Sequence, residues 1–94
     1  GGTAKAEIVR VASAGTLESS DVYVEIEPWE QGVEIQLESV VKGQFGGAIE
    51  SAVRATLAAF GVERARLTVS DRGAMECVIR ARVEPAVLRG RGES

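Results

Sequence analysis

Two segments in the first half of the chain alternate strictly between apolar and polar residues, and this alternation constrains the fold more than any other feature. The apolar positions fall on every second residue: Val22, Val24 and Ile26, then Val33, Ile35 and Leu37. A period of two is typical of a strand that buries one face. Gly32 lies between the two segments. The sequence therefore predicts two half-buried strands, 22–27 and 33–38, paired as an antiparallel hairpin.

From Gln44 the apolar period changes to three and four, which is typical of an amphipathic helix. The members of this stripe are Phe45, Ile49, Ala52, Val53, Thr56, Leu57 and Phe60. Gly61 follows the stripe, as a glycine often follows the last turn of a helix. Glu50 and Arg54 are four residues apart and are expected to pair on the exposed side. The sequence predicts one helix of roughly fifteen residues.

Three further segments read as strands: 5–12, 65–69 and 75–83. Alternation in the last one would put the Cys77 thiol on the apolar face, as inert packing, and Pro85 would end that strand. Trp29 is expected to cover an edge of the sheet. The predicted order is βββαββ. It indicates an α+β domain, with a mostly antiparallel sheet and one helix packed on one face.

A chain of 94 residues is expected to form one domain. We assign 3–88 to this domain, 89–94 to a flexible C-terminal tail and 1–2 to a remnant of expression. A net charge of −3 argues against nucleic-acid binding. One cysteine cannot form an internal disulfide, and no apolar run approaches the ~20 residues of a membrane helix. The expected location is the cytoplasm, away from the membrane.

Residues 14–21 form a small polar turn between two predicted strands. Ser19 lies there between Glu18 and the pair Ser20 and Asp21. The chain contains no histidine, so Ser19 lacks the base that a nucleophilic serine needs, and neither a catalytic triad nor the usual zinc site can form. Ser19 is better suited to be the substrate of another enzyme. The alternative is an ordinary solvated turn, whose carboxylates could still bind Mg²⁺ transiently or meet a basic partner. No catalytic or metal site is predicted.

Three separated blocks resemble the acyl carrier proteins of citrate lyase, its gamma subunits. The blocks are Ala-Gly-Thr-Leu-Glu-Ser-Ser-Asp-Val at 14–22, Gln-Phe-Gly with Ala-Ile at 44–49, and Asp-Arg-Gly-Ala-Met-Glu-Cys with Ile-Arg-Ala-Arg at 71–82. In that family, the serine of a Glu-Ser-Gly-Asp segment is joined through a phosphodiester to phosphoribosyl-dephospho-coenzyme A. This serine corresponds to Ser19. Ser20 replaces the glycine that usually follows, which leaves a second hydroxyl beside the expected attachment residue.

The resemblance implies a non-catalytic carrier subunit of a lyase complex. The thiol of the group would hold an acetyl group, which the alpha subunit would exchange for citrate with release of acetate. The beta subunit would then cleave the citryl thioester to oxaloacetate and leave the carrier acetylated. A prosthetic-group transferase and an acetylating ligase would be further partners. The acidic loop would suit steering toward basic rims on these enzymes. Ordinary acyl carriers resemble helical bundles with an Asp-Ser-Leu motif, which this chain lacks.

Two other interpretations stay open. The acyl carrier subunit of malonate decarboxylase resembles this family in its serine loop and uses a related group, although the segment 15–19 and the block around Cys77 favour citrate lyase. A structural role is the second possibility, in which exposed strand edges and Trp29 mediate assembly and the serine loop carries nothing.

Overall fold

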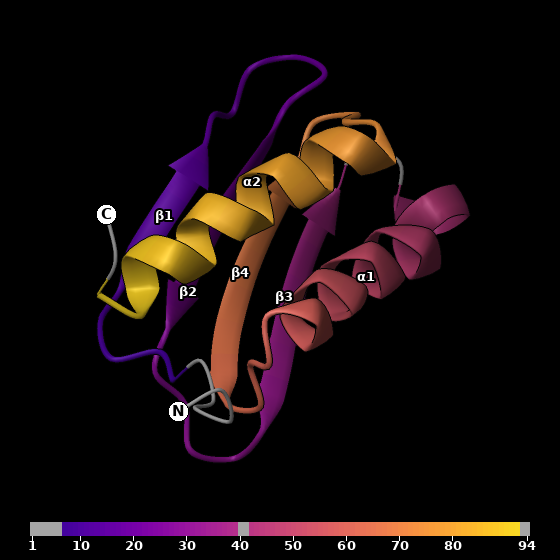
Figure 1. Ribbon diagram of the computed structural model, residues 1–94. Helices are drawn as coiled ribbons and strands as arrows, with labels where there is room; N and C mark the ends of the chain where they lie inside the picture. The colour runs from indigo at the N-terminus through magenta and orange to yellow at the C-terminus, as the bar shows by residue number, and fades with distance from the viewer. Residues whose placement is uncertain (1–6, 40–41, 93–94) are drawn as a thin grey trace.

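A sheet covered on one face by helices is the framework of the domain (Figure 1). The computed structural model describes residues 7–39 and 42–92, with the side chains of 42–46 outside the description. Within these residues the structure has six elements, in the order βββαβα. They are β1 (Ala12–Gly15), β2 (Val22–Glu27), β3 (Val33–Ser39), α1 (Lys42–Ala59), β4 (Ala65–Asp71) and α2 (Glu76–Gly90).

The strands are arranged in the order β1-β2-β4-β3. β2 pairs antiparallel with β1 and with β4, whereas β3 pairs parallel with β4. The α+β class is confirmed, but the sheet is mixed and the predicted hairpin of β2 with β3 is wrong, because β4 lies between them. Parallel neighbours need a crossover connection, and α1 supplies it between β3 and β4.

The alternating segments form strands as predicted. Val22, Val24 and Ile26 are fully buried beneath the helices, and the residues between them are half-buried on the opposite face. The predicted strand 5–12 is wrong for most of its length. Residues 5 and 6 lie outside the described residues, and β1 begins only at Ala12. The preceding backbone is tied elsewhere, since Val9 N and Arg10 N both donate to Gly90 O, at 2.9 and 3.1 Å.

The helix predicted from Gln44 is confirmed as α1, which begins two residues earlier. Its buried residues follow the predicted stripe: Ile49, Ala52, Val53, Thr56 and Leu57. Phe60 is partly buried against the core, and the Phe45 side chain lies outside the described ones. The exposed pair is also confirmed, with Arg54 Nε 2.9 Å from Glu50 Oε2. Gly61 has a φ of +71° just after the helix, where Val62 N donates back to Leu57 O.

The largest correction concerns the predicted strand 75–83, which is the first part of the helix α2 (Figure 1). The buried residues of α2 are three or four apart: Ile79, Val83, Ala86, Val87 and Gly90. Met75 and Cys77 are exposed, so the prediction that the thiol lies in the core is wrong. Ile79 and Val83 fit both periods, and this coincidence produced the apparent alternation. Pro85 lies inside the helix instead of ending a strand, where it leaves one intrahelical hydrogen bond unmade.

α2 also continues through Arg89 and Gly90, which the sequence placed in a tail. Gly90 is buried, and a Cβ added to it would lie only 3.1 Å from Ile26 Cγ2. Arg89 Nη1 donates to Ser13 O at 2.7 Å. These contacts anchor the last turn of α2 on β1 and β2. The sequence indicated one helix, whereas the described residues form two.

Trp29 does not cover a sheet edge. Its ring lies under the guanidinium of Arg66, 5.0 Å from the ring centroid, and Arg66 belongs to the internal strand β4. Of the helices in the described part of the chain, none is both long and apolar enough to cross a membrane.

The helical assignment of residues 76–90 predicts different costs for two truncations. Ile79→Ala should lower the free energy of unfolding by about 2–5 kcal/mol, because the side chain is buried in the core. Cys77→Ala should change it by no more than about 0.5 kcal/mol, since the thiol is exposed. Urea denaturation followed by circular dichroism measures both. Equally large losses of unfolding free energy in both variants would contradict the helix and support the predicted strand, in which both residues share the buried face.

Candidate functional site

The serine turn, residues 16–21, connects β1 to β2 at the end of the sheet where β4 meets α2 (Figure 1). Asp21 N donates to Glu18 O at 3.1 Å, which closes a four-residue turn. Ser20 has a φ of +66°, and Ser19 is not among the residues with positive φ. This combination defines a type II turn, with Ser20 at the position that favours glycine. Ser19 occupies the tip of the turn and is exposed.

Two backbone hydrogen bonds fix the turn to the loop that follows β4. Ser20 N donates to Arg72 O at 2.8 Å, and Arg72 N donates to Asp21 O at 2.9 Å. Two residues of one strand therefore oppose one residue of the other. This is a β-bulge of the type whose first residue is normally a glycine with positive φ. The bulge therefore favours a glycine at this position, and Ser20 occupies it with a side chain.

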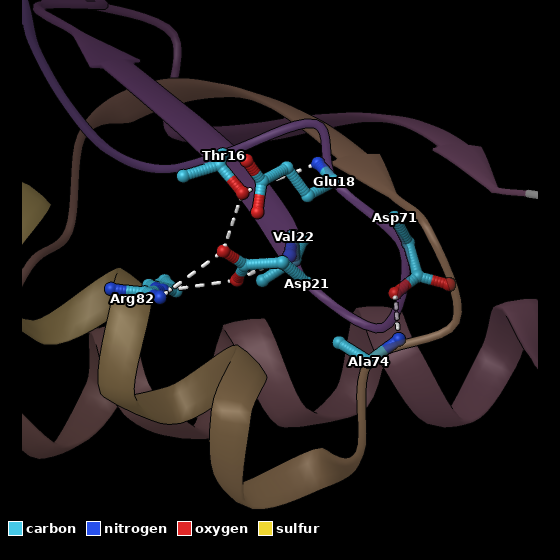
Figure 2. A network of polar contacts seen from close by, with 7 residues as sticks. All are labelled: Thr16, Glu18, Asp21, Val22, Asp71, Ala74 and Arg82. Carbon is cyan, nitrogen blue, oxygen red and sulfur yellow. Dashed lines mark hydrogen bonds and ion pairs between the residues drawn. The ribbon is translucent and has the colours of Figure 1, made fainter.

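The carboxylate of Asp21 is the centre of a polar network beneath the turn (Figure 2). Thr16 Oγ1 donates to Oδ2 at 2.7 Å, and Val22 N donates to Oδ1 at 2.7 Å. Arg82, which reaches over from α2, donates from Nε to Oδ1 at 3.0 Å and from Nη2 to Oδ2 at 3.1 Å. The hydrogen bond from Thr16, then that from Arg82 and then that from Val22 N, lower the pKa of Asp21 from 3.8 to about 2.

A second carboxylate holds the loop on the other side. Asp71 is buried at the end of β4; Ser39 Oγ donates to its Oδ2 at 2.7 Å and Ala74 N donates to its Oδ1 at 2.9 Å. Gly15 allows the serine turn to approach: its φ is +93°, and a Cβ there would overlap the Val22 carbonyl oxygen. Both loops at this end are thus fixed by hydrogen bonds that do not involve the Ser19 side chain.

The residues that the sequence singled out differ in exposure and in their hydrogen bonds. Ser19 and Glu18 are exposed, and no hydrogen bond of the Ser19 hydroxyl occurs among the described residues. Asp21 is turned inward to Arg82 and Thr16, so it does not form an open carboxylate pair with Glu18. Where residues are described, no group of three or more His, Cys, Asp or Glu side chains is placed to hold a metal ion.

Sequence reasoning missed Arg82 and Arg72 as parts of this site. The sequence placed Arg82 on a strand. In the structure it lies on the helix α2, from which its side chain binds Asp21. Arg72 lies between the predicted strands 65–69 and 75–83, where the sequence indicated no role for its side chain. Its Nε is shielded from solvent and has no hydrogen-bond partner in the structure. No signal in a single sequence shows that a residue 61 positions away will pair with Asp21.

The comparisons with known proteins define the class of this chain. Residues 9–90 match the family model described as malonate decarboxylase delta subunit (MdcD), a family of acyl carrier subunits, and the chain belongs to this family. Within it, the chain is 58% identical over 84 residues to the citrate lyase acyl carrier protein of Escherichia fergusonii, which covers 88% of this chain and 87% of that protein. The citrate lyase acyl carrier protein of Haemophilus influenzae is 46% identical over 88 residues, or 94% of this chain and 92% of that protein. The predicted resemblance to citrate lyase acyl carrier proteins is confirmed.

A solved structure shares the fold. A chain in the crystal structure of a Pseudomonas malonate decarboxylase hetero-tetramer in complex with malonate superposes with a TM-score of 0.76, covering 92% of this chain and 89% of that chain. The sequence identity is 23%, so this likeness supports the fold alone.

The bulge predicts opposite effects for the same substitution at neighbouring residues. Ser20→Gly should raise the free energy of unfolding by about 0.5–1 kcal/mol. A non-glycine residue at positive φ is strained by about 1–2 kcal/mol, and the greater freedom of glycine in the unfolded chain offsets about 0.4–1 kcal/mol of the relief. Ser19→Gly should lower the free energy of unfolding, because Ser19 has no such strain to relieve and glycine gains freedom in the unfolded chain. Chemical denaturation of the two variants measures the difference, and a loss of stability in both would contradict the assigned turn.

The network around Asp21 predicts a defined dependence of stability on pH. The carboxyl has a folded pKa of about 2 against an ordinary value of 3.8. Its contribution is therefore fully present above pH 3.8 and disappears as the pH falls through about 2. We expect the stability difference between the wild type and Asp21→Asn to shrink over this interval, as measured by thermal unfolding at several pH values. The difference should also shrink when both proteins carry Arg82→Gln. A difference that stays constant down to pH 2 would argue against the network.

Proposed function

We propose that this chain is the acyl carrier subunit of citrate lyase and that Ser19 is the residue to which its prosthetic group is attached. The single observation that carries the proposal is the exposed Ser19 at the tip of a turn that is held entirely by other groups. An enzyme can reach this hydroxyl without breaking a hydrogen bond of the described structure. The high identity to citrate lyase acyl carrier proteins supports the particular complex.

The turn also favours Ser19 over Ser20 as the attachment residue. Ser20 is fixed in the bulge through its backbone N–H and has a strained φ. Ser19 precedes it, is also exposed, and is not among the residues with positive φ. In the attachment step, the Ser19 Oγ would bond to the phosphorus of an activated phosphate ester precursor, whose leaving group departs. The hydroxyl proton would pass to a base of the transferase, because the chain has no histidine.

The described residues fit the proposed group, phosphoribosyl-dephospho-coenzyme A. The attachment oxygen is open to solvent, and the adjoining loop holds a guanidinium nitrogen that has no partner. When bound, the group supplies a thiol that carries the acyl group as a thioester. The chain itself holds the attachment point still: Thr16 and Arg82 bind Asp21 below the turn, and Asp71 binds the neighbouring loop. In this role the chain is a carrier and not a catalyst.

The surface around Ser19 supports contact with other proteins. Any enzyme that acts on Ser19 must cover this end of the sheet, where Leu17 and Met75 are 57% and 71% exposed on the two joined loops. Glu18 and Glu76 add exposed negative charge, which would favour partners with basic rims. The proposed partners are the alpha and beta subunits of citrate lyase, the prosthetic-group transferase and the acetylating ligase, in the cytoplasm.

A second candidate is the carrier subunit of malonate decarboxylase. It is favoured by the description of the matching family and by the likeness to a chain of the malonate decarboxylase crystal structure. Both candidates share the modified serine and differ in the enzymes that load the thiol. Reconstitution of the modified chain with the citrate lyase alpha and beta subunits, compared with the corresponding malonate decarboxylase subunits, separates them.

Co-expression of the chain with the prosthetic-group transferase tests the attachment. We expect intact-mass spectrometry to show one added nucleotide-containing group on the wild type and on Ser20→Ala, but none on Ser19→Ala, because both hydroxyls are exposed but only Ser20 is held in the bulge at a positive φ. Ser13→Ala, a half-buried serine of β1, serves as a further control and should be modified. An adduct on Ser19→Ala that disappears in Ser20→Ala would move the site by one residue, and an unmodified wild type would refute the carrier role.

A further inference from the structure

We propose that the guanidinium of Arg72 is the counter-ion of the phosphodiester that forms on Ser19. This inference rests on the proposed function, and it adds a residue that binds the anchor of the prosthetic group. Three observations carry it: the unpaired state of Arg72, its position next to the serine turn, and the way in which the neighbouring carboxylates are already engaged.

Arg72 is a partly buried cation without a partner. Its side chain is half-buried, and Nε is shielded from solvent with no hydrogen bond in the structure. Arg82 and Arg66, by contrast, are paired with Asp21 and with Glu34. A guanidinium cannot lose its charge in a protein, and a shielded N–H without an acceptor costs free energy. An anion that arrives later would satisfy it.

The position of Arg72 suits an anion on Ser19. Its N–H and C=O are bonded to Asp21 and Ser20, at 2.9 and 2.8 Å, so its backbone runs alongside the residues that follow Ser19. Ser19 is only one peptide from Ser20, about 3.8 Å between Cα atoms. An arginine side chain is long enough to span the short separation between this backbone and a phosphate on the Ser19 oxygen, and the two backbone bonds would not need to change.

The nearby buried and half-buried carboxylates are already engaged. Asp21 is occupied by Thr16, Val22 N and Arg82, and Asp71 by Ser39 and Ala74 N. Neither is paired with Arg72 in the described structure. A phosphodiester is a permanent anion, and the planar guanidinium matches phosphate oxygens with two parallel N–H donors. The modification would therefore supply the acceptor that the Arg72 side chain lacks.

The test compares modified and unmodified carrier in the wild type, in Arg72→Gln and in Arg72→Lys. Arg80→Gln, an exposed arginine of α2, is the matched control. Modification should raise the Tm of the wild type and of Arg80→Gln by roughly 2–5 °C at low salt, and by less at about 1 M salt, since the pair is partly exposed. Arg72→Gln should lose this increment, and Arg72→Lys should retain part of it. The ³¹P resonance of the phosphodiester should shift between the wild type and Arg72→Gln but not between the wild type and Arg80→Gln.

A measurement on the wild type alone tests the proposal even if Arg72→Gln does not fold. The Arg72 Nε–H signal should move and exchange more slowly with solvent once Ser19 is modified. If the Tm increment and the ³¹P shift are the same in the wild type and in Arg72→Gln, or if the Nε–H signal is unchanged by modification, the proposal is wrong. Intact mass is recorded first, so a chain that gains no group at Ser19 refutes the proposed function itself and is distinguished from a failure of this inference.

Discussion

The two backbone hydrogen bonds between the serine turn and Arg72 determine the geometry on which the rest of the site depends. They place two residues opposite one, and this bulge needs a positive φ at Ser20. Ser20 is fixed through its backbone, and Ser19 beside it is exposed. A position in which the backbone is restrained and the side chain is open is what a covalent anchor requires, because the attached group can move while its root stays in place.

The site is built from both layers of the domain. The turn and the loop after β4 belong to the sheet, whereas Arg82 comes from α2 and binds the carboxylate of Asp21 through two N–H groups. α2 is in turn anchored on the sheet by Val83 and by the close contact of Gly90 with Ile26. The packing of one helix is thus connected to the position of the serine turn, although no hydrogen bond of the described structure joins the helix to Ser19.

Local patterns predicted the parts of this fold that are defined by their own residues. The alternation in β2 and β3, the stripe of α1 and the polar turn around Ser19 each specify an element without reference to the rest of the chain. The region 75–83 fits two periods over a short window, and Pro85 favoured the wrong one. The decisive evidence lies further on, in Ala86, Val87 and Gly90, which continue the period of three and four. The order of the strands could not be predicted from these patterns. It depends on the path of α1, which places β4 between β2 and β3.

Much of the candidate site could be expected from the sequence, but not its support. Ser19 and its exposure follow from turn chemistry and from a family motif. The roles of Arg82 and Asp71 depend on contacts between residues far apart in the chain, Asp21 with Arg82 and Ser39 with Asp71, and Thr16 binds Asp21 only in the particular shape of this turn. Such contacts leave no trace in one sequence, since a threonine in a loop or an arginine in a charged stretch has many ordinary explanations.

The direction of α2 has a practical consequence for handling the molecule. Its first turn lies beside the serine turn, while its last turn is bonded to Val9 and Arg10 at the far end of β2. Both outer segments of the described chain therefore meet at the pole opposite Ser19. A fluorophore, a fusion partner or a solid support joined there would leave the serine turn open to a second protein.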